Sequence, residues 1–186
     1  MFGKNESDSM SAAGSNSVAA ILRVFVRVIF WATVIFGGLA FVLLLLGLFT
    51  SLNGGELNAQ IGNAVSGDLS PATFLASLAG LIVLVPGISY ICMQLNRILA
   101  TLAAGDPFIP ENAPRLTRIA GTIAIMELAR YVLIFLMFLF GDFGEDIEGV
   151  RFSVSLVAWV SAAAMLVFSQ VFREGSRLRE EEKMTV

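Results

Sequence analysis

The chain has 186 residues, of which 56% are hydrophobic and 15% are charged, and its mean hydropathy is +0.81. An ordinary soluble domain carries roughly 25% charged residues, so the composition excludes a conventional soluble fold and indicates a protein whose apolar surface faces lipid. The 12 basic and 15 acidic residues give a net charge of only −3, which offers no support for direct nucleic-acid binding.

The residue types that most catalytic and metal sites need are scarce. Histidine is absent, and Cys92 is the single cysteine of the chain. The commonest general base and metal ligand is therefore missing, and one cysteine builds neither a disulfide framework nor a thiolate cluster. We expect neither an enzyme nor a protein with a bound metal or cofactor.

The chain opens with a polar segment and then becomes apolar. Residues 1–17 are rich in Ser, Gly and Asn without periodicity, and we predict a disordered cytoplasmic tail there, followed by a membrane domain over residues 18–186. The first apolar run covers about 28–49. A spanning helix needs roughly 20 apolar residues, whereas the apolar region of a cleaved signal peptide has about 7–15, so this run predicts a membrane span.

Three further runs are long enough to cross a bilayer, at about 73–95, 119–140 and 152–172. The second begins near Pro71, which fits the first turn of a helix, and contains Pro86 followed by a glycine. A proline inside a helix removes a backbone hydrogen bond and predicts a kink, which is either purely structural or part of a binding site.

Basic residues fix the expected orientation, because short cytoplasmic loops carry an excess of Lys and Arg. The loops at 50–72 and 141–151 contain only Arg151, whereas ten basic residues lie on the other side: Lys4, Arg23, Arg27, Arg97, Arg115, Arg118, Arg173, Arg177, Arg179 and Lys183. We therefore predict an all-α, four-helix transmembrane bundle of two hairpins with both termini in the cytoplasm. Leu57, Ile61 and Val65 recur every four residues and predict a short helix on the outer surface.

Two charges lie inside the third span. Glu127 and Arg130 are three residues apart, hence on one face of a helix, and Arg130 is about 18 Å from Arg118 at 1.5 Å per residue. A charge near the middle of the bilayer is costly unless it is paired, so we expect the two side chains to satisfy one another inside the bundle. They form either a proton or ligand site or a structural ion pair that fixes helix register.

The cytoplasmic loop, residues 96–118, carries apolar residues where a wet loop is expected. Leu95, Ile98, Leu99 and Leu102 have helical spacing, so the second helix should continue until Gly105 ends it, and Asn112 is the expected N-cap of the third. These residues either pack on the protein itself, including a helical extension over 173–186, or form a docking surface. The predicted partner surface comprises Leu99, Leu102, Pro107, Phe108, Ile109, Asn112 and Arg115.

The same loop carries a family resemblance. The residues concerned are Gly105, Pro107, Phe108, Asn112, Arg115 and Leu116, together with the ending FREGSRLREEEKMTV. With these motifs the chain resembles a bacterial family of four-helix membrane proteins classified as a domain of unknown function, over nearly its whole length from about Arg23. The resemblance implies a bacterial plasma-membrane protein without an established activity, whose relatives are often paired with small helix-turn-helix transcription regulators.

Two functions from different classes follow. The first is a membrane-embedded interaction or regulatory protein that acts through its cytoplasmic loop and tail, with a helix-turn-helix regulator as the partner that the resemblance implies. The second is a small transporter or channel that uses Glu127 and Arg130, as a homo-oligomer because four helices leave little room for a polar path.

Overall fold

A computed structural model describes residues 4–53, 71–140 and 154–184 of the chain. These residues form four α-helices and, over the same ranges, no strand. The helices are α1 (Lys4–Asn53), α3 (Pro71–Ala103), α4 (Asn112–Phe140) and α5 (Leu156–Met184). The predicted helix around Leu57, Ile61 and Val65 lies outside the described residues.

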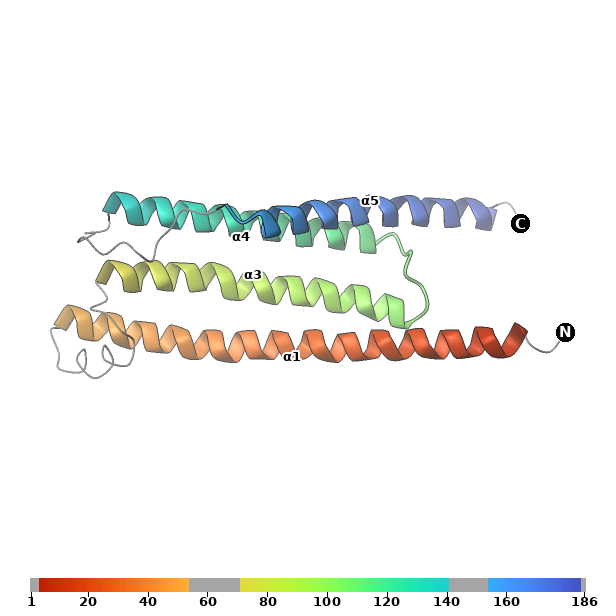
Figure 1. Cartoon of the computed structure of the whole chain (residues 1–186), viewed down its shortest axis with the longest axis horizontal. Helices are drawn as coiled ribbons and strands as arrows, with labels where there is room; N and C mark the ends of the chain where they lie inside the picture. Colours follow the sequence, from red (N-terminus) through yellow and green to blue (C-terminus); the bar gives the residue numbers. More distant parts are fainter. Residues whose placement is uncertain (1–3, 54–70, 141–153, 185–186) are drawn as a thin grey trace.

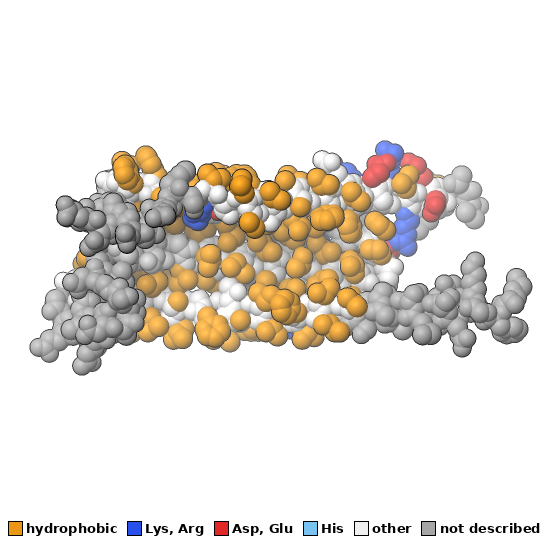
Figure 2. Space-filling view, viewed as in Figure 1, with side chains coloured by type: hydrophobic (Ala, Val, Ile, Leu, Met, Phe, Trp, Pro, Cys, Tyr) orange, Lys and Arg blue, Asp and Glu red, His pale blue; other side chains and the backbone are white. Residues whose placement is uncertain are grey.

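Each helix is long and apolar enough to cross a membrane, so the predicted four-helix membrane fold is confirmed. The candidate spans cover Val18–Leu52, Pro71–Ala103, Asn112–Leu139 and Leu156–Glu182. Figure 2 shows apolar side chains spread along the sides of the helices, with charged side chains gathered near the end of α5. Exposing such a continuous apolar surface to water is unfavourable, so this fold requires a lipid bilayer around its helices.

The helices pack in chain order. α1 packs on α3, α3 on α4, and α4 on α5, which gives two antiparallel hairpins joined through α3 and α4. Among the described residues, α1 and α5 do not contact each other, so the bundle is an open row. The start of α1, the α3–α4 loop and the end of α5 lie at one end of the molecule (Figure 1), which we call the basic end.

Small residues allow the helices to approach closely. A Cβ at Gly47 of α1 would lie 2.4 Å from the ring of Phe74, and one at Gly37 would lie 2.5 Å from Val85, so α1 meets α3 through its glycines. At the basic end, Val26 packs with Cys92 and Leu99. Close contacts between apolar side chains, and between side chains of α3 and the glycines of α1, therefore hold the α1–α3 hairpin together.

The helix α3 continues through Pro86 without ending. Gly87 leaves room for Met126 of α4, whose Sδ would lie 2.3 Å from a Cβ at that position. The Oγ of Ser89 is buried and has no hydrogen-bond partner. The α4 helix therefore packs closely against α3 directly after the proline, and the hydroxyl of Ser89 makes no hydrogen bond there.

Two predicted boundaries need correction. The tail predicted over 1–17 is instead helical from Lys4, because adding residues to a helix already nucleated in the following apolar run costs far less than starting one. The fourth helix begins at Leu156 rather than Phe152. Ser155 is its N-cap, since the Ser155 Oγ accepts a hydrogen bond from the backbone N–H of Ala158 at 3.3 Å.

Candidate functional site

The loop at the basic end starts where the sequence predicts. Gly105 has a φ of +78°, a conformation that costs glycine little, and its N–H donates to the Leu102 carbonyl at 3.0 Å. The N–H of Asp106 donates to the Thr101 carbonyl at 3.1 Å. This pair of bonds is the Schellman arrangement, which ends α3 and turns the chain toward α4.

Asn112 holds the loop together from inside. Its side chain is fully buried, and its Nδ2 donates to the Thr101 Oγ1 at 2.7 Å and to the Pro107 carbonyl at 2.8 Å. Its Oδ1 accepts a hydrogen bond from the Arg115 guanidinium at 2.9 Å. One amide thus joins the end of α3, the loop and the first turn of α4.

The predicted role of Asn112 as N-cap is wrong. A side chain that caps from this position accepts from the backbone N–H two or three residues later. Pro114 has no N–H, and the N–H of Arg115 donates to the Glu111 carbonyl at 3.4 Å. The amide of Asn112, already inside the helix, is therefore free to turn back toward the loop.

The α3–α4 loop also packs against the α5 extension, residues 173–184. The ring of Phe108 lies 5.4 Å from that of Phe172, and its edge lies where a Cβ at Gly175 would be, at 2.6 Å. Arg179 forms an ion pair with Asp106. An aromatic contact, a glycine and an ion pair together fix the loop on α5.

The predicted partner surface divides into buried and accessible residues. Leu99 and Asn112 are buried, and Leu102 packs on the cluster of Ile98, Leu116 and Ile119. Leu99 and Asn112 are thus covered by the protein's own residues and cannot meet a partner directly, whereas Leu102 is half-buried against α4. Of the remaining predicted residues Phe108 is exposed, at 40%, and three are half-buried: Pro107, Ile109 and Arg115.

A polar contact that the sequence reasoning missed joins α4 to α5 near the loop. Ser169, 1% exposed, donates to the Ala113 carbonyl at 2.8 Å, and its Oγ lies 2.8 Å from the Oγ1 of Thr117. A serine with a neighbouring glutamine, inside an otherwise apolar run, was the available signal. This contact fixes the register of α4 and α5 beside Asn112.

Glu127 and Arg130 form the predicted pair. The Arg130 Nε donates to the Glu127 Oε2 at 3.0 Å and its Nη2 to Oε1 at 2.6 Å, a bidentate arrangement. The guanidinium carbon also lies 5.0 Å from the ring centroid of Tyr131. The Glu127 side chain is 8% exposed and that of Arg130 is 37% exposed.

The Glu127–Arg130 pair, which belongs to α4, lies beside the first residues of α5. The backbone N–H of Ser155 donates to the Glu127 Oε1 at 3.4 Å, so the carboxylate sits where the helix dipole favours a negative charge. One turn away, the Trp159 indole donates to the Tyr131 hydroxyl at 3.2 Å. The pair is thus central along α4 but terminal with respect to α5, which the sequence distance from Arg118 could not reveal.

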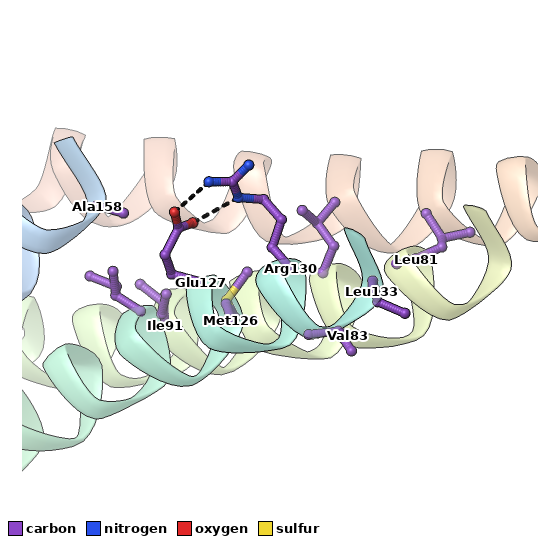
Figure 3. Close-up of a pocket in the computed structure, with 11 residues that line it drawn as sticks. Leu81, Val83, Ile91, Met126, Glu127, Arg130, Leu133 and Ala158 are labelled. Carbon is purple, nitrogen blue, oxygen red and sulfur yellow. Dashed lines mark hydrogen bonds and ion pairs between the residues drawn. The ribbon is translucent and has the colours of Figure 1, made fainter. Parts of the chain in front are cut away.

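A cavity of about 370 Å³ lies beside the pair, between α3, α4 and α5. Figure 3 shows Glu127 and Arg130 pointing toward one another, beside apolar side chains from α3 and α4 such as Val83, Met126 and Leu133. Apart from the pair, the lining consists of apolar side chains and Gly80. This mostly apolar lining suits an apolar ligand better than an ion.

The model of the family described as "Protein of unknown function (DUF2975)" matches residues 10–186, which is nearly the whole chain. Searches of the curated proteins and of the solved structures gave no match. The loop built around Gly105 and Asn112 and the α5 extension both fall within the matched range. The chain belongs to the DUF2975 family.

Proposed function

We propose that the protein is a membrane-embedded interaction protein that presents the α3–α4 loop and the α5 extension to a cytoplasmic protein. The observation that carries the proposal is Phe108. Its ring is held by Phe172 and Gly175, yet 40% of the residue is exposed in a loop beyond the apolar part of the helices. A fixed, partly exposed aromatic side chain is typical of an anchor residue at a protein interface.

The α5 extension supplies the rest of this surface. Leu178 is 52% exposed and is three residues from Gly175, so it lies on the helix next to the contact with Phe108. Charged residues surround it, including Arg177, which pairs with Glu174 at 2.8 Å and with Glu181 at 3.5 Å. An apolar centre with a charged rim is the usual anatomy of an interface. We call Phe108 and Leu178 the docking pair.

Topology and partner class are further parts of the proposal. The excess of basic residues at the basic end supports a cytoplasmic position for it in a bacterial plasma membrane, with both termini inside. The family resemblance supports a small helix-turn-helix transcription regulator as the partner. The chain has no histidine, which supports a binding role without catalysis.

Site-specific photocrosslinking in cells tests the proposal. A benzophenone side chain placed at Phe108 or at Leu178 should give one adduct of the same mass, because both positions face the same partner. Val157, 77% exposed at the other end of α5, is the matched control and should give no such adduct. Leu178→Glu should reduce capture through position 108 roughly tenfold, the effect of losing about 1.4 kcal/mol from an anchor.

Two outcomes would count against docking. One is the same set of adducts at Val157 as at the docking pair, and the other is no protein adduct at either member of the pair. An adduct with a protein lacking a helix-turn-helix would reject the partner class and leave the surface in place.

The transporter or channel hypothesis draws on the cavity beside Glu127 and Arg130. Its support is weaker, because the Glu127 carboxylate is already engaged by Arg130 and by the N–H of Ser155. The residues that line the cavity offer no other charged side chain to continue a polar path. Docking at the basic end therefore remains the function that the geometry supports best.

A further inference from the structure

A second cavity, of about 190 Å³, lies between α1 and α3 near the basic end. Its apolar part is formed by the buried Val26 and Cys92 and by the rings of Phe30 and Trp31, which meet edge to face at 5.7 Å. Its polar part is formed by Arg27 and Asn96. The cavity thus combines a cation with an aromatic wall.

The two helices give this cavity a polar end and an apolar end. α1 runs away from the basic end, so Trp31 lies one helical turn, about 6 Å, deeper than Arg27. α3 runs toward the basic end, so Met93 lies deeper than Asn96 by nearly one turn. Both walls are therefore polar near the basic end and apolar below it. A phospholipid that stands in a bilayer has the same order, with the headgroup above and the acyl chains below.

The charge of the polar end selects an anion. No acidic residue is among the residues that line this cavity, and no hydrogen bond or ion pair joins Arg27 to another described residue. The Arg23 Nε donates to the Asn96 Oδ1 at 3.4 Å, which turns the amide so that its Nδ2 hydrogens remain available to donate. A guanidinium and an amide N–H are suitable donors for phosphate oxygens.

We propose that this cavity binds an anionic phospholipid of the leaflet at the basic end, with the headgroup phosphate on Arg27 and Asn96. The adjoining part of an acyl chain lies against Trp31 and Met93. Basic pockets between transmembrane helices bind acidic lipid headgroups in general, and tryptophan is enriched at the same depth. The volume is smaller than the roughly 300–1,000 Å³ of pockets that enclose a whole ligand, which fits a lipid that leaves most of its chains in the bilayer.

Native mass spectrometry of the full chain, released from nanodiscs that hold equal amounts of phosphatidylglycerol and phosphatidylcholine, tests the proposal. Wild type should retain one phosphatidylglycerol in preference to phosphatidylcholine. Arg27→Gln should lower the apparent affinity for phosphatidylglycerol about tenfold. Arg118→Gln removes the same charge from an exposed position on α4 outside the cavity and should leave the preference unchanged.

The alternatives give different results. Equal retention of the two lipids by wild type would overturn the proposal, as would an equal loss in both variants, which indicates unspecific attraction to the surface. Displacement of phosphatidylglycerol by millimolar inorganic phosphate would also overturn it, in favour of a soluble anion. Glycerophosphoglycerol, which lacks acyl chains, should compete poorly.

Fluorescence gives a second readout that does not depend on lipid surviving extraction. In a Trp159→Phe background, Trp31 is the remaining tryptophan of the chain. Phosphatidylglycerol brominated near the start of its chains should quench Trp31 more than brominated phosphatidylcholine at the same mole fraction. Arg27→Gln should abolish the difference and Arg118→Gln should keep it. Equal quenching by the two lipids in the Trp159→Phe protein would contradict the proposed site.

Discussion

Asn112→Ala is expected to lower the free energy of unfolding by about 2–4 kcal/mol, the largest effect of any single change in the loop. The substitution removes an amide that is fully buried. It leaves the Pro107 carbonyl without its donor and the Arg115 guanidinium without its acceptor. Each buried polar group that loses its partner costs about 1–3 kcal/mol, to which a small cavity adds.

Cys92 provides the measurement. It is the single cysteine of the chain and is buried, so a thiol-reactive dye reports unfolding during heating in detergent. Asn112→Ala should lower the apparent Tm by roughly 5–15 °C, whereas Glu111→Ala, at the exposed neighbouring position, should change stability by less than about 0.5 kcal/mol. Similar Tm values for the two variants would mean that the amide network does not hold the loop.

Glu127→Leu is expected to lower the abundance of folded protein several-fold in membranes. The change leaves the Arg130 cation without the carboxylate that pairs with it, in surroundings of apolar side chains. It also removes the acceptor for the Ser155 N–H at the start of α5. Breaking one member of an ion pair in an apolar setting destabilises more than removing both.

The double variant separates a structural pair from a functional one. Glu127→Leu with Arg130→Met removes both charges and should restore abundance and the dye-reported Tm close to wild type. Crosslinking through Phe108 should also persist, because the docking pair lies at the other end of α5. A double variant as impaired as Glu127→Leu alone would show that the pair has a role beyond charge compensation.

Local chemistry made the helices predictable. Runs of apolar residues predicted the four helices, and Gly105 marked the end of α3, because hydropathy and cap residues act over a few neighbouring positions. The start of α5 was harder to predict from the sequence. Val154 is as apolar as the helix that follows, so the hydropathy pattern concealed the cap at Ser155.

Contacts between distant segments could not be read from the sequence. Spacing placed Leu99 on an apolar stripe, but it could not show that α1 covers that residue through Val26. The hydrogen bonds of the Asn112 amide depend on where Thr101 and the Pro107 carbonyl lie after the turn. The position of Gly175 under Phe108 depends on the register of α4 against α5, which Ser169 fixes.

Docking of a cytoplasmic protein on the α3–α4 loop and the α5 extension requires a basic end that lies in the cytoplasm. In a Cys92→Ser background, single cysteines at Leu52, at the far end of α1, and at Glu180, in the α5 extension, are probed on intact cells with a membrane-impermeant maleimide. A cytoplasmic basic end predicts labelling at position 52 in intact cells and at position 180 only after the cells are permeabilised. Labelling at position 180 in intact cells would contradict it.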